Sequence, residues 1–226
     1  MKAVITTFMV LTFSVAHAQG FQRPTCDDYI HKFGGPCLDG VDGKSVTGTL
    51  PVASRTVMGF TMGDKTFDDA NKILGDAQRW HTGDAAASEE KICYFAKNGS
   101  ENVTLVLAQN SEMGSAIDDM RLIGGSVSFQ NQCKELKAAP SAFRTESGIR
   151  IGMTEKELRA ILGKPSGSKD SMLVYGWTES SENAPKDFCL DDNGKSMAAR
   201  GSEITARFIS GRLDWINIGL DSGWQC

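Results

Sequence analysis

The sequence predicts an α+β protein, a tandem repeat of a helix packed on an antiparallel three- to four-stranded sheet and stapled by disulfides. Three observations predict it: a helix-like segment occurs twice, strand-like runs follow each copy, and cysteines recur at matching places. We assign repeat 1 to residues 57–136, a linker to 137–146 and repeat 2 to 147–226. An N-terminal extension closed by its own disulfide precedes them at 19–56.

The two helix-like segments share the same start and stop signals. Each begins at a threonine, Thr66 or Thr154, whose hydroxyl suits an N-cap. Three residues later an acid, Asp69 or Glu157, completes the pattern of a capping box. Apolar residues then recur on one helical face, and both segments end in Ile-Leu-Gly, a glycine suited to a left-handed C-cap.

Strand-like runs follow each helix. In repeat 1 we expect strands at Ala77–Thr82, Lys91–Ala96, Asn102–Gln109 and Ile117–Gly124. In repeat 2 we expect them at Met172–Glu179, Asp187–Leu190, Glu203–Ser210 and Leu213–Ile218, with a tight hairpin at Ser210-Gly211-Arg212. Two such sheets either join into one larger curved sheet or remain two separate units, and the pattern leaves both open.

The repeat selects among the possible disulfides. Six cysteines allow 15 pairings. Aligning the copies matches Cys93 with Cys189 and Cys133 with Cys226, so each repeat is expected to be stapled from one of its strands to its tail. The predicted pairs are therefore Cys93–Cys133, Cys189–Cys226 and the remaining Cys26–Cys37.

The N-terminus predicts export. Lys2 precedes an uncharged, mostly apolar run, and Ala16-His17-Ala18 provides the small residues of a signal peptidase site. We therefore expect residues 1–18 to be a signal peptide and cleavage before Gln19 to leave a soluble periplasmic or secreted protein. An even cysteine count fits such an oxidising compartment.

Composition excludes several function classes. The formal net charge of −4 becomes −5 when Lys2 is removed, which argues against a nucleic-acid or anionic-membrane surface. No later segment is long enough to span a membrane. There is no CxxC, and only two histidines remain after cleavage, so we expect no metal site and no cofactor.

The second helix belongs to a longer motif. The residues that carry it are Gly148, Gly152, Met153, Thr154, Glu157, Leu158, Leu162, Gly163, Pro165, Tyr175, Trp177, Phe208, Gly211, Arg212, Leu213 and Ile216. This pattern resembles the SmpA/OmlA outer-membrane assembly lipoproteins and the tandem-repeat β-lactamase inhibitor proteins. The chain lacks a lipidation cysteine and has two units, which favours the inhibitor-like arrangement. That resemblance implies a sheet face that grips a loop of a target enzyme.

Strand alternation indicates the residues of such a face. Ile204, Ala206 and Phe208 are expected under the helix, which turns Thr205 and Arg207 to the other face. In the next strand Trp215 and Asn217 are expected to share that face. Tryptophan and arginine dominate protein-binding hot spots, and whether Trp215 is exposed or buried stays open.

Four further residues are candidates for binding a partner. They are Tyr175 and Trp177, whose face the pattern does not decide, together with Trp80 and Met120 in repeat 1. His31 lies in a short helix-like stretch, Cys26–Phe33, ended by Gly34, and is interpreted as a surface or half-buried residue.

Three hypotheses for function follow. The first is a non-catalytic exported module that binds another exported or envelope protein, as an inhibitor or immunity-type partner. The second is a periplasmic envelope-assembly accessory protein. The third is a small hydrolase, disfavoured because the sequence has no G-x-S-x-G, no H-E-x-x-H and few histidines.

Overall fold

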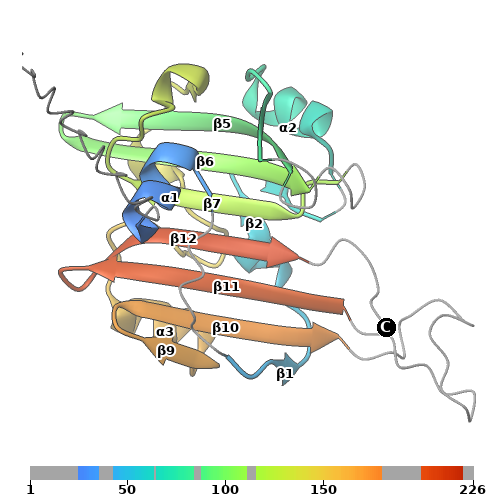
Figure 1. Ribbon diagram of the computed structural model, residues 1–226, viewed down its shortest axis with the longest axis vertical. Helices are drawn as coiled ribbons and strands as arrows, with labels where there is room; N and C mark the ends of the chain where they lie inside the picture. Colours follow the sequence, from blue (N-terminus) through green and yellow to red (C-terminus); the bar gives the residue numbers. More distant parts are fainter. Residues whose placement is uncertain are drawn as a thin grey trace, which may run out of the picture.

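The protein is an α+β fold built on one large mixed sheet (Figure 1). The computed structural model describes residues 25–35, 43–63, 65–83, 88–110, 116–179 and 200–220. The predicted signal peptide and the predicted strand Asp187–Leu190 lie outside the described residues.

Ten strands of the described ranges form the main sheet, in the order β1-β10-β11-β12-β7-β6-β5-β4, with β8 beside β5 and β9 beside β10. Their bounds are β1 Val46–Thr47, β4 Trp80–Thr82, β5 Glu89–Asn98, β6 Glu101–Asn110, β7 Asp119–Gly124, β8 Lys134–Glu135, β9 Gly167–Lys169, β10 Met172–Glu179, β11 Arg200–Ile209 and β12 Arg212–Leu220. A small hairpin of β2 (Thr56–Val57) and β3 (Phe60–Thr61) stands apart from this sheet.

The antiparallel pair β7 and β12 joins the two halves of the sheet. Met120 pairs with Ile218 and Arg121 with Asn217. The alternative that the sequence left open is thereby decided, because the strands of residues 77–124 and 172–220 form one sheet.

The strand predictions hold best where alternation is strong. β10 has the predicted bounds, and β5, β6 and β12 extend beyond theirs at both ends. β11 begins earlier than predicted, at Arg200, and ends one residue earlier, at Ile209. The predicted β11–β12 hairpin is confirmed: Ser210 and Gly211 both have positive φ, at 51° and 74°, as a two-residue hairpin turn requires.

Three helices lie in the described ranges: α1 (Cys26–Phe33), α2 (Phe67–Leu74) and α3 (Glu155–Leu162). Each begins with a complete capping box, and those at Thr66 and Thr154 are the predicted ones. The predicted left-handed C-caps of α2 and α3 are wrong. Gly75 and Gly163 have positive φ, at 88° and 81°, but extended ψ, because the chain leaves both helices directly into extended segments.

Short 3-10 turns connect these elements: η1 (Val52–Arg55), η3 (Gln130–Gln132) and η4 (Pro140–Ala142). η4 falls within residues 137–146, where Pro140 and Phe143 are both buried. None of the helices in the described ranges has the length and apolar character needed to span a bilayer.

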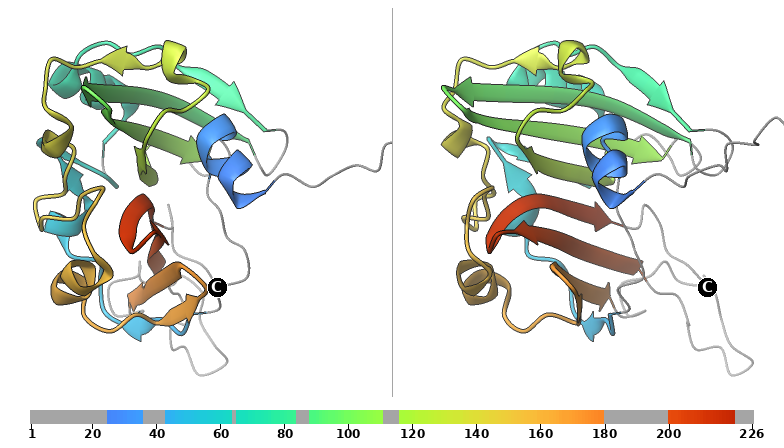
Figure 2. Two further views of the ribbon diagram at one scale, coloured as in Figure 1. Left: turned by 90° about the vertical axis from the view of Figure 1, so that its left-hand side faces the viewer. Right: turned by 60° about the vertical axis from the view of Figure 1, so that its left-hand side comes forward.

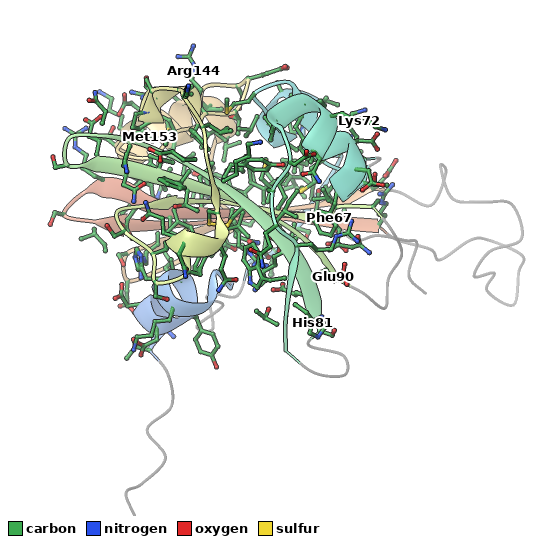
Figure 3. All side chains as sticks on the ribbon, turned by 90° about the horizontal axis from the view of Figure 1, so that it is seen from above. Phe67, Lys72, His81, Glu90, Arg144 and Met153 are labelled. Atoms are coloured by element: carbon green, nitrogen blue, oxygen red, sulfur yellow. A yellow bond between two sulfur atoms is a disulfide. The ribbon has the colours of Figure 1, made fainter. Side chains whose placement is uncertain are left out.

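The sheet carries a buried cluster on each face. α2 and α3 lie on one side of the sheet and α1 on the other (Figures 2 and 3). The larger cluster includes Phe67, Ala70 and Leu74 of α2 and Leu158 of α3, packed with apolar residues of eight strands: β2, β3, β5, β6, β7, β10, β11 and β12. The smaller cluster lies on the α1 side and consists of Ile30, Cys93, Val106, Ile123, Val127, Phe129, Met172 and Trp215.

The predicted Cys93–Cys133 disulfide is confirmed, and it joins β5 to the segment before β8 across 40 residues of chain. Cys26 is also disulfide-bonded. The predicted Cys26–Cys37 and Cys189–Cys226 pairs involve Cys37, Cys189 and Cys226, which lie outside the described residues.

Removing the Cys93–Cys133 bridge is expected to destabilise the protein. The double variant C93A/C133A should lose about 2–4 kcal/mol of unfolding free energy, because a closed 40-residue loop restricts the unfolded chain. Urea denaturation of the mature protein measures this loss. A loss below about 0.5 kcal/mol would show that the bridge contributes nothing to stability.

Candidate protein-binding face

The candidate site is the face of the sheet that carries Thr205, Arg207, Trp215 and Asn217, which we call the α1 face. Arg207 pairs across the strands with Trp215, and Thr205 with Asn217. Their neighbours along each strand belong to the larger cluster on the opposite face: Ile204, Ala206, Phe208, Ile216 and Ile218. The alternation predicted for both strands is therefore confirmed.

The α1 face is covered. Trp215 is fully buried, Thr205 is 1% exposed, and Arg207 and Asn217 are each 7% exposed. The expectation of an open face is wrong, because α1 packs on the sheet here and inserts the fully buried Ile30 into the same cluster as Trp215. Further along the same face, Gly43 lies against Val174 of β10.

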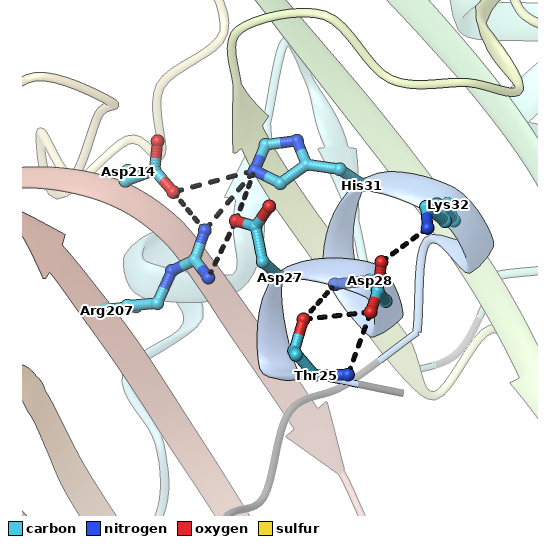
Figure 4. A network of polar contacts seen from close by, with 7 residues as sticks. All are labelled: Thr25, Asp27, Asp28, His31, Lys32, Arg207 and Asp214. Atoms are coloured by element: carbon cyan, nitrogen blue, oxygen red, sulfur yellow. Dashed lines mark hydrogen bonds and ion pairs between the residues drawn. The ribbon is translucent and has the colours of Figure 1, made fainter. Parts of the chain in front are cut away.

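Arg207 anchors the N-terminal part of α1 (Figure 4). Its Nη1 donates to Asp27 Oδ1 at 3.4 Å, and its Nη2 donates to Asp214 Oδ2. His31 Nε2 lies 3.3 Å from the same Nη2 and 3.7 to 3.8 Å from the two carboxylates. Burial would raise the pKa of the Asp214 carboxyl, but His31 and Arg207 outweigh it and lower that pKa.

Arg121, a residue that sequence reasoning missed, anchors the other end of α1. This fully buried guanidinium donates from Nη1 to the carbonyl oxygen of Gly34, the C-cap of α1. Its Nε donates to Asn217 Oδ1 at 2.9 Å and its Nη2 to Glu89 Oε1 at 2.7 Å. One side chain of β7 therefore holds β5, β12 and α1 together.

The charges around Arg121 are balanced within a buried cluster. Glu89 also pairs with Lys91, with 2.8 Å between Oε2 and Nζ, and Asp119 Oδ1 lies 2.9 Å from Arg121 Nε. Burial alone would raise the pKa of the Glu89 carboxyl, but Arg121 and Lys91 hold it at about 2. Burial raises the pKa of Asp119 against the opposing charge of Arg121, and it lowers the pKa of Lys91.

Besides the Thr104 hydroxyl of β6, two buried donors on the α1 face have no hydrogen-bond partner in the described structure: Trp215 Nε1 and Arg207 Nε. They belong to residues that pair directly across β11 and β12. A buried donor without an acceptor costs about 1–3 kcal/mol. α1 thus provides partners for Arg207 and Arg121 and leaves these buried donors unmet.

The four remaining candidates do not join this face as a group. Tyr175 and Met120 are buried in the larger cluster on the opposite face, and Trp177 packs against that cluster, its ring stacked on Tyr175 at 6.5 Å. Trp80 packs against the smaller cluster and lies 5.8 Å from the ring of Phe129. Met120 of β7 and Trp215 of β12 therefore lie on opposite faces.

Sequence reasoning missed the acidic and basic partners of the face. Arg121 alternates with Met120 and Leu122, so period-two alternation carries the signal that places it opposite the core. No comparable signal links Asp27 to Arg207, because 180 residues separate them.

Two clefts lie away from the α1 face. One of about 390 Å³ lies between the β5–β6 turn, η4 and the loop before α3, and its lining includes Asn102, Val103, Ser141 and Arg150. The other, of about 260 Å³, is lined by residues that include Val52, Arg55, Glu179 and Arg200. No group of three histidine, cysteine or acidic side chains suited to a metal occurs in the described ranges.

Comparison with known proteins assigns no family. No family model, curated protein or solved structure matches the chain. The function is therefore argued from the α1 face itself.

Replacing Arg121 is expected to destabilise the protein strongly. The variant Arg121→Met keeps most of the side-chain volume but leaves Glu89 and Asp119 without their main counter-charge, which should cost about 3–5 kcal/mol in unfolding free energy. The matched control is Arg159→Met, because Arg159 forms an exposed ion pair with Glu155 within α3 and should change stability by less than about 1 kcal/mol. Equal unfolding free energies for the two variants would contradict this role of Arg121.

The depressed pKa of Glu89 predicts a loss of stability in acid. The pKa of Glu89 is lower in the folded protein than in the unfolded chain. Its contribution to stability is therefore complete above about pH 4.5 and is lost as the pH falls towards about 2. Over that interval the unfolding free energy of the wild type should fall by about 3 kcal/mol more than that of Glu89→Gln. The two unfolding free energies should converge near pH 2. Parallel pH profiles from urea denaturation would contradict the assignment.

Proposed function

We propose that this chain is a non-catalytic exported protein-binding module that uses its α1 face against another exported or envelope protein. The proposed partner is an extracytoplasmic enzyme, which the chain acts on as an inhibitor or immunity-type protein. The observation that carries the proposal is that the face already holds a helix, through arginine contacts to a carboxylate and a carbonyl and through an apolar contact with Ile30.

The chemistry of the face supports protein recognition. Arg207, Arg121 and Trp215 are of the residue types enriched at interface hot spots, and all three are buried on this face, Trp215 within the smaller apolar cluster. The resemblance of residues 148–226 to the tandem-repeat inhibitor proteins supports the same class of function.

We further propose that the sheet is a duplicated unit, with α2 and β4–β7 in one copy and α3 and β9–β12 in the other. The strand arrangement supports it: β10-β11-β12 meets β7-β6-β5 at the centre. β5 and β10 also each carry one short antiparallel strand and one short parallel strand along the outer edge. In this alignment β10 corresponds to β5.

The duplicated unit gives the face its extent. β7 and β12 sit side by side, so Arg121 from one unit and Asn217 from the other meet in the middle of the face. A single three-stranded unit offers only half of this surface.

The role of the face can be tested with Trp215→Phe. The change removes the unpartnered indole N–H and a little volume, so the free energy of unfolding should change by less than about 1 kcal/mol. A partner that accepts a hydrogen bond from this group should bind about three- to tenfold more weakly. The measurement is retention of proteins from the organism's own exported fraction on immobilised mature chain, identified by mass spectrometry and followed by titration of the retained protein.

The matched control is Trp177→Phe, the same change of side chain on the opposite face of the sheet. The proposal is supported if wild type and Trp177→Phe retain a single soluble enzyme and Trp215→Phe binds that enzyme more weakly. Retention of a membrane assembly complex supports the accessory-protein alternative instead. Retention that is equal for all three baits contradicts binding through the α1 face.

A further inference from the structure

α1 carries a compact set of groups that match the α1 face. The Asp27 carboxylate meets Arg207, the Ile30 side chain enters the cluster of Trp215 and Ile123, and the Gly34 carbonyl meets Arg121. These groups all lie within ten residues at the start of the described chain. The helix therefore makes contacts of the kind that a bound segment of another protein would make.

The attachment of α1 is mostly polar. Of the α1 side chains that the structure describes, Ile30 alone is fully buried, whereas Asp27, Tyr29 and Lys32 are exposed. An eight-residue helix is marginal by itself in water, so its stability depends on its attachments, which also include the disulfide of Cys26 and the hydrogen bonds from Ser128 to the His31 and Lys32 carbonyls. A helix held in this way can leave the sheet without unfolding the larger cluster on the opposite face.

α1 is also an incomplete match for the face. Trp215 Nε1 and Arg207 Nε remain buried without acceptors while α1 is in place. A segment that supplied the same carboxylate and aliphatic groups, together with one or two further acceptors, would satisfy donors that α1 leaves unmet. Such a segment would make hydrogen bonds on this surface that α1 does not make.

We infer that α1 is an internal occupant of the binding face, displaced by the partner, and that the partner presents an acidic segment with an aliphatic side chain and exposed carbonyl groups. This inference rests on the proposed function, and it adds the chemistry of the partner and an autoinhibitory role for residues 25–35. The apparent affinity of any partner is then reduced by the fraction of molecules in which α1 is bound.

The variant Asp27→Ala tests displacement. It removes the carboxylate contact from α1 to Arg207 and leaves the Arg207–Asp214 pair and the His31 contact with Arg207 in place, so no buried charge loses its only partner. The matched control is Asp68→Ala. Asp27 and Asp68 are both the second residue of a capped helix, both side chains are exposed, at 68% and 80%, and each pairs with one arginine. The control therefore reproduces the loss of a helix-start acid without touching the α1 face.

The probe is a fluorescein-labelled peptide with the sequence of Thr25–Gly35 and the change Cys26→Ser, titrated with mature protein by fluorescence anisotropy. We expect it to bind Asp27→Ala about two- to fivefold more tightly than wild type, because the internal helix is released more often. Asp68→Ala should match wild type. A peptide that also carries Asp27→Ala should bind two- to fivefold more weakly than the unmodified peptide.

Three outcomes separate this inference from the proposed function. Equal peptide affinity for Asp27→Ala and Asp68→Ala, or concentration-dependent dimerisation of Asp27→Ala with no peptide binding, overturns displacement. Suppose that an exported protein binds Trp215→Phe more weakly than wild type, but binds Asp27→Ala and Asp68→Ala with equal affinity. That result supports the proposed function and overturns this inference. If the peptide affinities are as expected but no exported protein is retained, α1 is a releasable occupant of the face and the proposed function is overturned.

Discussion

The structure depends on one buried guanidinium. Arg121 stands at the centre of the sheet, where it bonds Asn217 of the neighbouring half, Glu89 of β5 and the carbonyl that ends α1. A buried arginine is tolerated only when its charge and its donors are satisfied, since one missing partner leaves an uncompensated charge in a low-dielectric interior. The register between β7 and β12, the position of α1 and the ionisation of Glu89 are therefore linked through this side chain.

That constraint gives the two faces of the sheet different physical characters. The face under α2 and α3 is apolar and is closed by close packing of aliphatic and aromatic side chains. The α1 face has a band of buried polar and charged groups, from Glu89 and Lys91 through Arg121 and Asn217 to Arg207. Apolar packing determines what covers the first face, whereas hydrogen-bond geometry and charge determine what covers the second. A surface specified by geometry and charge can discriminate between segments that occupy it, which is what a recognition face requires.

Local signals predict the part of the fold that local interactions determine. Capping boxes and glycine stops predict α2 and α3, and period-two alternation places Arg207 and Trp215 on one face, as the structure does. The repeat predicts the Cys93–Cys133 bridge. What local signals do not contain is the seating of α1 on β11, because that contact joins residues 180 apart and depends on a surface formed by both halves of the sheet. Exposure of Trp215 could not be decided from its strand for the same reason.

The central claim is that α1 is folded and seated on the sheet in the free protein, and hydrogen exchange of its backbone amides tests this most directly. The amides of Gly34 and Gly35 donate to the carbonyls of Ile30 and Tyr29, bonds that an isolated helix of this length would rarely keep. With α1 docked through Arg121 and Arg207, these two amides should exchange at least about tenfold more slowly than the unprotected amides of the same chain. Exchange at the unprotected rate would contradict the account.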